Sequence, residues 1–509
     1  MKPNEELFEL IKSLKKSEKR YIKLYSCLQS GNKNYLILFD EISSQAEKGI
    51  PYNEGIIKRK FKYEKFIKQL TFTKNYLAEL IFKSLALYNS GSSIDFTITQ
   101  QIIKARILYN KALYKYFFKV TESIKKTCMK YERFSFHLQV LEMEKVVIIK
   151  KIYPEKDETD VLDEEIKILN IIRNITEYNF IVSQLASLYR KKGRLREESQ
   201  AKLLKNISER YIMMSENRAL SEIARERFYF VKQLVADLRG DHKEIYTCAL
   251  KRLEIIQNNP KPFKDQNFNY WQDIIMYILF QINKSGDLSS FDKYFFMLKE
   301  HSGSTEAEQI NLFLIESLVS LMRLNSFTPI GELNNLISSI LNGLGIHEGK
   351  VDANFEILIY NSIVKAYFKR NMYAEANKYI NMLLNHPQIS IREDVELYAK
   401  IINLIIHLEL GNIDLLEYLI KSTYRYLKNR NNVYKFETIL MKFLKKLSAI
   451  STNKQFIELL ELARKEINLL EGDPFEKNAV NQFDFSLWID LKIARLKLEN
   501  NTANKPIYV

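Results

Sequence analysis

Two groups of basic side chains are the residues of this chain whose types and spacing could do chemistry. They are Lys12, Lys16, Lys19 and Lys23 near the N-terminus, followed by Lys58, Arg59, Lys62 and Lys65. At these intervals of three or four positions, the lysines of each group share one side of a helix. Such arrays contact phosphates without reading a nucleotide sequence. The pattern predicts contacts with an anionic partner, and its alternative is a solvated helix face, which lysine commonly occupies.

The net charge of the chain has the same bias. Residues 1–150 contain 28 Lys and Arg against 15 Asp and Glu, a net charge of +13, whereas the remaining 359 residues have a net charge of +2. A basic end indicates an anionic partner, which can be a nucleic acid, a membrane surface or an acidic protein. The whole chain is rich in Lys, Asn, Ile and Tyr, but that general bias does not explain an excess confined to one end.

Catalytic and metal-binding patterns give no comparable signal. The six histidines are scattered, and Cys27, Cys128 and Cys248 lie about 100 and 120 residues apart, so none has metal-ligand or redox spacing. No Gly-x-Ser-x-Gly elbow occurs, and the carboxylates Glu142, Glu144 and those at 163–165 read as solvated helix faces. We therefore expect a protein that is not an enzyme and that has no catalytic residue, metal or cofactor.

A glycine-rich stretch at 343–349 needs a separate interpretation. It contains three of the 14 glycines of the chain, together with His347 and Glu348. A phosphate-cradling loop would follow a strand and open a helix, and no strand-like alternation precedes this stretch. The sequence predicts a long loop between two repeats here.

The elements that must position the basic groups are helices. Only 14 Gly and 9 Pro occur in 509 residues, and apolar positions recur at helical rather than strand spacing. Small or turn-forming residues separate the amphipathic stretches at steps of 39 to 47 residues, after one double step of 81: Ala112, Gly193, Gly240, Gly286, Asn325, Asn371, Gly411 and Asn453. The turn missing from the double step is expected near Tyr153 and Pro154. This period predicts an α-solenoid of stacked helix pairs.

The clearest unit runs from Tyr360 to Pro387. Its first helix has an apolar stripe through Tyr367, and its second has one through Tyr373 and Ala376 before Pro387 ends it. These aromatic, small and closing residues resemble tetratricopeptide-repeat positions, although the period exceeds the 34 residues usual for that repeat. The resemblance implies a right-handed superhelix of helix-turn-helix repeats.

The chain as a whole resembles an uncharacterised family of helical proteins found in Bacteroidetes-type bacteria. The resemblance rests on four short segments, which are 10–14 with 17–21, 73–77, 409–412 and 434–437. It spans most of the length and implies the helical-repeat fold. It implies no activity.

Three regions follow from these patterns. Residues 1–90 form a basic N-terminal helical module, whose first helix runs toward Gln29 or breaks at Ser17. Within it, a short helix, a turn at 71–73 and a helix from Lys74 could present Lys74 and Asn75 to bases, with ordinary helix packing as the alternative. Residues 95–470 form the tetratricopeptide-like solenoid. Residues 473–509 form a C-terminal capping helix that starts at Asp473 and Pro474, with the apolar stripe Phe483, Leu487, Trp488, Leu491, Ala494 and Leu498.

Two functions are compatible with this architecture. The leading one is a non-enzymatic scaffold or adaptor that binds a protein or peptide along its repeat surface. The second is a regulator whose module 1–90 binds nucleic acid while the repeats sense a ligand or partner. The N-terminus begins without an apolar signal segment, no apolar run reaches the ~20 residues of a membrane span, and the cysteines suit a reducing compartment. We expect a cytoplasmic protein.

Overall fold

The computed structural model describes residues 3–27, 34–89, 91, 93–152, 157–210, 213, 215–265, 270–285, 287–300, 305–324, 328–430, 433–447, 450–473, 475–482 and 485–500. Every regular element within these ranges is helical, so the predicted all-α class is confirmed. The chain divides into two compact units, residues 1–168 and residues 169–509. The division falls inside the longest helix, α9 (Glu158–Lys192). The boundaries predicted near residues 90 and 470 stay predictions.

The first unit contains the helices up to the start of α9. They are α1 (Pro3–Ser13), α2 (Lys16–Cys27), α3 (Asn34–Glu47), α4 (Glu54–Lys60), the 3-10 helix η1 (Lys65–Gln69), α5 (Leu70–Tyr88), α6 (Ile94–Asn110), α7 (Tyr114–Tyr131) and α8 (Phe134–Ile149). The helices α1 to α5 surround an apolar core centred on Ile11, Ile22, Leu38, Ile42 and Leu77, all fully buried. Successive helices from α6 to α8 pack as neighbours.

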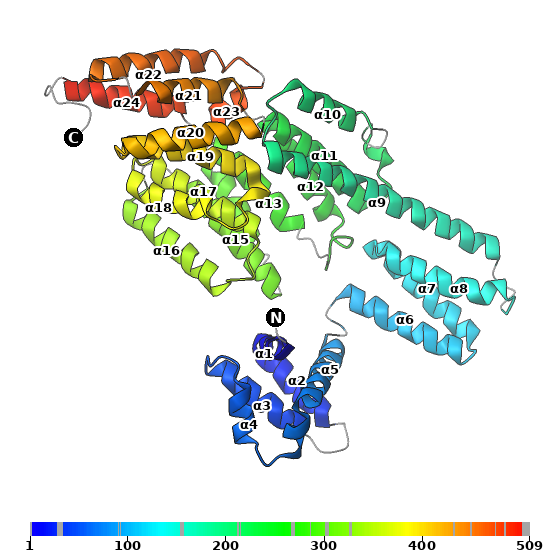
Figure 1. The fold of residues 1–509 in the computed structure, drawn as a ribbon. Coiled ribbons are helices and arrows are strands. Elements are labelled where there is room, and N and C mark those ends of the chain that lie inside the picture. Colours follow the sequence, from blue (N-terminus) through cyan, green and yellow to red (C-terminus); the bar gives the residue numbers. More distant parts are fainter. Residues whose placement is uncertain are drawn as a thin grey trace. The chain divides into compact units, whose positions relative to one another are not determined.

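The second unit is a succession of packed helices (Figure 1). Its elements are the rest of α9, α10 (Glu198–Ser208), η3 (Glu216–Arg218), α11 (Glu222–Arg239), α12 (His242–Asn258), α13 (Tyr270–Ser285), α14 (Leu288–Glu300), α15 (Glu306–Arg323), α16 (Ile330–Ile346), α17 (Ala353–Phe368), α18 (Tyr373–Leu384), η4 (Ile389–Arg392), α19 (Glu393–Glu409), α20 (Ile413–Asn429), α21 (Lys435–Lys446), α22 (Asn453–Asn468), α23 (Lys477–Gln482) and α24 (Phe485–Asn500). Each helix packs mainly on the next one or two along the chain. This arrangement is solenoid-like, as the repeat period predicts.

Five of the predicted turns have the left-handed backbone that a helix C-terminus commonly needs. The φ angles of Ala112, Gly193, Gly240, Asn371 and Gly411 lie between +56° and +75°. At Gly240 the amide of Asp241 donates to the carbonyl of Ala236 at 2.9 Å, and the Asp241 carboxylate accepts the amide of Glu244, so one turn closes α11 and caps α12. Asn453 begins α22 instead of forming a turn. The turns predicted at Gly286, Asn325 and residues 153–154 lie outside the described residues.

The glycine-rich stretch at 343–349 differs from the prediction of a long loop. Helix α16 continues to Ile346, so Gly343 and Gly345 are helical, and only the last three residues form a turn. A Cβ at Gly343 would lie 2.3 Å from the Phe313 ring of α15. Gly343 therefore lets that ring pack directly on the helix backbone.

The C-terminal helices also depart from the predicted stripe. Phe485, Trp488 and Ile489 of α24 are buried, whereas Leu487, Leu491 and Leu498 are more than half exposed. The buried face of α24 is thus rotated relative to the predicted one. Asp473 does cap this region, since its carboxylate accepts the amide of Phe475 at 2.9 Å. Pro474 and Phe483 lie outside the described residues.

A buried ionic network joins three consecutive helices. Arg252 of α12 is fully buried and donates to Glu226 of α11 at 2.6 Å and to Asp273 of α13 at 2.9 Å. Its guanidinium lies 4.0 Å from the Phe230 ring centroid. A buried charge of this kind is tolerated only when it is paired and hydrogen-bonded, so the network fixes the register of the three helices.

Hydrogen bonds and ion pairs connect the beginning of the second unit to its last helices. Residues 192–197, which link α9 to α10 and are called the closing segment below, contact α11 through the Leu195 amide and Leu238 carbonyl at 2.8 Å. Arg196 of this segment donates to Glu437 of α21 at 3.0 and 2.8 Å and to Glu476, just before α23, at 2.9 Å. The unit therefore closes on itself across 241 residues of sequence.

Candidate functional site

The N-terminal basic residues are partly gathered in one groove. Lys16, Lys19 and Lys23 of α2 line a groove of about 540 Å³ against α3, as the spacing predicts. Arg20, which the sequence argument did not single out, lines it as well. Its position four residues from Lys16 and three from Lys23 is the signal that would have included it.

Two of these lysines already have acidic partners on α3. Lys19 contacts Glu47 at 3.0 Å, and Lys23 contacts Asp40 at 2.7 Å. The hydrogen bond and charge of Lys19 lower the pKa of Glu47. Lys16 has no ion pair among the residues that the structure describes. The groove thus holds four cations against two carboxylates and keeps a net positive charge.

Lys12 does not belong to this groove. The predicted single first helix is broken after Ser13, because the Glu18 carboxylate accepts the amide of Lys15 and caps a new helix. Lys12 lies on α1 and contacts Glu9 at 3.6 Å on the surface. The break falls close to the alternative position predicted at Ser17.

The second basic group is not a continuous helix face. Helix α4 ends at Lys60, so Lys58 and Arg59 are on α4, Lys62 is in a turn and Lys65 begins η1. Lys58 is paired with Glu54 at 2.7 Å, and this hydrogen bond raises its pKa.

The predicted turn at 71–73 is also wrong. Helix α5 begins at Leu70, because η1 leads directly into it. Lys74 is then buried against Glu54 and Tyr52, so it cannot reach a base. Ordinary helix packing, the stated alternative for this segment, accounts for it.

Of the carboxylates predicted to be solvated, Glu142 and Asp163 are exposed, whereas Glu144, Glu164 and Glu165 hold helices together. Glu144 of α8 is buried and contacts Lys125 of α7 at 3.1 Å. Glu164 at the start of α9 contacts both Lys125 at 2.7 Å and His137 at 2.8 Å. The hydrogen bond with His137, and then that with Lys125 against partial burial, lower the pKa of Glu164 to about 2. The cluster is a structural ion-pair network of α7, α8 and α9.

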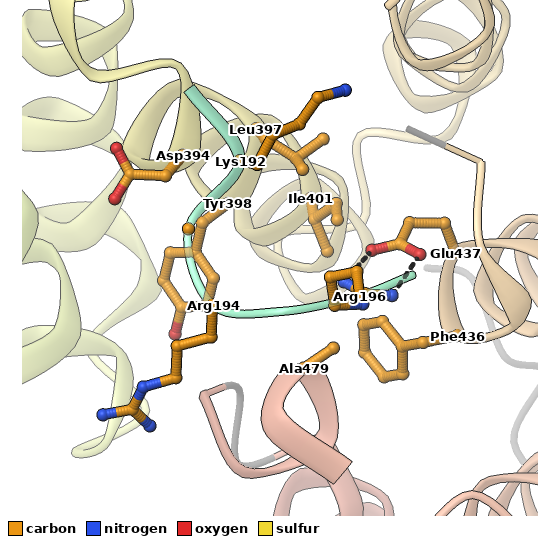
Figure 2. Close-up of a pocket in the computed structure, with 11 residues that line it drawn as sticks. Lys192, Arg194, Arg196, Asp394, Leu397, Tyr398, Ile401, Phe436, Glu437 and Ala479 are labelled. Atoms are coloured by element: carbon orange, nitrogen blue, oxygen red, sulfur yellow. Dashed lines mark hydrogen bonds and ion pairs between the residues drawn. The ribbon is translucent and has the colours of Figure 1, made fainter. Parts of the chain in front are cut away.

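In the second unit, the closing segment borders a small hollow (Figure 2). Figure 2 shows Asp394, Tyr398 and Arg194 at one end of the segment and Arg196 with Glu437 at the other. The hollow has a volume of about 40 Å³. Burial opposes the charge of Arg196, but Glu437 and Glu476 raise its pKa, so it stays ionised.

Charged and aromatic residues from five α-helices, η4 and the closing segment lie near this hollow, and two of them, Arg194 and Asp394, line it. We call this set the central cluster: Tyr189, Arg194, Asp237, Tyr277, Lys284, Lys365, Arg392 and Asp394. Arg194 pairs with Asp237 at 3.2 Å, and Arg392 holds Asp394 through two hydrogen bonds of 2.8 and 2.7 Å. A Cβ on Gly193 would lie 3.5 Å from that of Asp394. The Arg392 guanidinium lies 6.0 Å from the Tyr189 ring centroid.

Two lysines of the central cluster have no carboxylate partner within ion-pair distance among the described residues. Lys365 of α17 is half-buried and lies 4.5 Å from the centroid of the Tyr398 ring. Lys284 of α13 contacts the Nε2 atom of His242 at 3.0 Å, while the Nδ1 atom of His242 lies 2.9 Å from Gln281. Burial, and then the charge of Lys369, lowers the pKa of Lys365 to about 8. Lys284 is exposed, and partial burial of its ammonium group, and then the charge of Arg194, lowers its pKa to about 8.

A larger groove runs along α21 and α22. Its wider part, of about 650 Å³, lies between α21 and the turn that follows α22, and it adjoins a narrower hollow through Ile439 and Glu466. Leu469, 75% exposed, lines the wider part, and Leu462, 44% exposed, lines the narrower hollow of about 10 Å³, so both present apolar area to solvent. Lys435, Lys442 and Lys446 line its α21 side, the first two paired with Asp473 at 2.7 Å and Glu466 at 3.0 Å.

Nucleophilic and metal-binding groups do not assemble in the part of the chain that the structure describes. No cluster of three or more His, Cys, Asp and Glu suited to a metal ion occurs there. Cys128 and Cys248 are buried, and burial raises the pKa of each to about 12, so neither is a thiolate at neutral pH. No described helix combines the length and apolar character needed to cross a membrane.

Comparison with known proteins adds no relative. No protein-family model, curated protein or solved structure matches the chain. The geometry of its own residues is therefore the basis on which a function can be proposed.

Proposed function

We propose that this protein is a non-enzymatic scaffold or adaptor that binds a segment of a partner protein in the α21–α22 groove. The observation that carries the proposal is the pair Leu462 and Leu469, whose exposed side chains line the two adjoining parts of this groove. Contiguous apolar surface with a polar rim is typical of protein-binding sites. We propose further that the helix pairs are tetratricopeptide-like repeats and that the protein is a cytoplasmic bacterial protein.

The chemistry of the groove defines the partner. Leu462 and Leu469 would be covered by apolar side chains of the partner segment, since that burial is the main source of affinity. Lysines on the α21 side would meet its acidic residues, because Lys446 has no ion pair among the described residues and complementary charge selects and orients a partner. An amphipathic helix with apolar residues three or four apart and acidic neighbours fits this description.

Two exposed leucines provide the test. Leu462→Asp and Leu469→Asp should each abolish recovery of the partner from host extract, while the exposed Leu220→Asp, outside the groove, should leave it unchanged. Circular dichroism would check that all three variants stay folded, as their exposure predicts. Equal recovery with the groove variants and with Leu220→Asp would contradict the proposal.

A second function has its own observation. Lys16, Lys19, Arg20 and Lys23 line one open groove with excess positive charge, which supports nucleic-acid binding by the first helices. If about three phosphates are contacted, affinity for a 30-nucleotide single strand should fall roughly 20-fold between 50 and 200 mM salt. Lys16→Ala with Arg20→Ala should weaken binding and flatten that dependence, whereas the exposed Lys454→Ala should not. Weak binding that does not vary with salt would remove this function.

A further inference from the structure

The turn between α4 and α5 keeps positive charge that the fold does not neutralise. We call residues 59–72 the basic corner. Its Lys60 is paired with Glu41 at 2.5 Å, and the neighbouring Lys58 with Glu54 at 2.7 Å. Four exposed cations of the basic corner have no ion pair among the residues that the structure describes: Arg59, Lys62, Lys65 and Lys68. Glu64 is the one carboxylate in this stretch of sequence, so the basic corner has an excess of positive charge.

Two aromatic rings protrude among these cations. Tyr63 has 95% of its surface exposed, and Phe72 has 70%. Tyr63 lies just before the 3-10 helix η1, and Phe72 lies just after it, in the first turn of α5. The five residues of η1 separate them by only about 10 Å, since a 3-10 helix rises about 2.0 Å per residue. One surface could therefore cover both rings, which would remove a large apolar area from water.

We propose that the basic corner docks on the surface of a lipid bilayer that contains anionic lipids. Lys and Arg side chains are attracted to the negative headgroups of such a bilayer. Tyrosine is favoured at the level of the headgroups, and phenylalanine is favoured at the boundary with the acyl chains. Charge and apolar insertion together give firmer binding than either alone. This docking is separate from the α21–α22 groove and does not depend on partner binding there.

The shape of the basic corner favours a bilayer over a nucleic-acid strand. In Figure 1 the chain turns between α4 and α5 at the outer edge of the helices α1 to α5. Proteins that bind single strands hold them along a groove, and Lys19, in the groove of α2 and α3, has only 17% of its side chain exposed. Tyr63 instead projects from the fold, with the Nζ atom of Lys62 6.0 Å from its ring centroid. A projecting ring can enter a flat headgroup layer but cannot form the wall of a groove.

The test is flotation of the full chain with lipid vesicles. The chain should float with vesicles of phosphatidylcholine that contain roughly one third phosphatidylglycerol, and much less with vesicles of phosphatidylcholine alone. Raising the salt concentration should weaken the binding, because salt screens the attraction between exposed charges. Absence of binding to the anionic vesicles, or equal binding to both kinds of vesicle, would overturn the proposal.

Two double variants separate the contributions of charge and of apolar insertion. Lys62→Ala with Lys65→Ala removes two cations, and it should weaken binding to the anionic vesicles roughly tenfold or more. Tyr63→Ser with Phe72→Ser removes the two projecting rings, and it should weaken binding by a similar factor. All four side chains are exposed, so circular dichroism and the melting temperature should match those of the parent.

Matched controls come from the second unit. Lys202→Ala with Lys205→Ala removes two exposed lysines of α10, and Phe296→Ser removes an exposed ring of α14. Neither control should change vesicle binding. Unchanged vesicle binding by both variants of the basic corner would overturn the proposal. If those variants instead lost affinity only for a single-stranded nucleic acid, the basic corner would belong to a nucleic-acid site and the proposal would be wrong.

Discussion

The protonation of one side chain, Lys365, affects the free energy of unfolding of the second unit. Its pKa in the folded chain is about 8, against an ordinary value of 10.5. Between these two pH values the unfolded chain still binds the proton that the folded chain has released, so stability must rise with pH across this window. The groups that act on Lys365 come from its own helix and from the helices packed on it: Lys369, Lys284, Arg392, Asp394 and Tyr398.

The titration of Lys365 has a measurable effect on stability. The free energy of unfolding of the parent relative to Lys365→Met should rise by about 2 kcal/mol between pH 7.5 and 9.5. Urea titrations at several pH values would measure it, and subtracting the variant removes the contribution of other titrating groups. A difference that stays constant with pH would mean that Lys365 titrates normally.

Glu164 has the opposite pKa shift, which is downward. Its lowered pKa of about 2 means that its contribution is present above the ordinary value of 4.5 and is lost as pH falls toward 2. Glu164→Gln should lower the stability of the first unit by about 2 kcal/mol at pH 7 and make it less sensitive to acid. Glu9→Gln, on the surface of α1 in the same unit and paired with Lys12 at 3.6 Å, should change it by less than about 0.5 kcal/mol. Equal effects of the two substitutions would contradict the role of the His137 and Lys125 contacts.

At the scale of the helical elements, Gly411 sets the turn between α19 and α20. Its φ is +72°, and its amide donates to the carbonyl of Leu408 at 3.2 Å. Gly411→Pro removes that donor and cannot adopt the conformation, so it should cost about 3 kcal/mol or more. Gly345→Ala, within α16 and with no atom near the added Cβ, should instead stabilise by about 0.5–1 kcal/mol. Thermal melts of both variants would check the contrast, and an unchanged melt for Gly411→Pro would place the turn elsewhere.

The elements also show how far sequence reasoning reaches. Gly240 and Gly411 were predictable because each separates two complete apolar stripes. The role of Gly343 was not predictable, because the sequence does not distinguish a glycine that makes room for the Phe313 ring from a glycine that ends a helix. Spacing alone could place Lys16, Lys19 and Lys23 on one helix face. Lys12 lies outside their groove because Glu18 caps a new helix, and spacing does not reveal that cap.

At the scale of the whole second unit, the ion pairs of Arg196 connect the beginning of the unit to its last helices. Its guanidinium is held by two buried carboxylates far along the chain, Glu437 and Glu476. No local pattern predicts such a contact, because the partners are separated by 241 and 280 residues. The central cluster was equally out of reach, since its members come from helices that meet only when the unit closes.

Removing Arg196 should therefore be costly. Arg196→Met leaves two buried carboxylates without their cation, and it should lower the free energy of unfolding by about 3–5 kcal/mol. Arg173→Met, which removes a side chain that is 78% exposed, should have an effect below about 0.5 kcal/mol. Guanidinium titrations would measure both, and similar values would show that the closure contributes little.

The closing segment also has a mechanical consequence. An open row of helix pairs is elastic, because neighbouring pairs can slide and the row can lengthen gradually from either end. Here any extension must first separate Arg196 from Glu437 and Glu476, so the second unit should resist force up to a threshold and then yield in one step. Pulled from its two ends in a single-molecule experiment, it would behave as a latch and not as a spring.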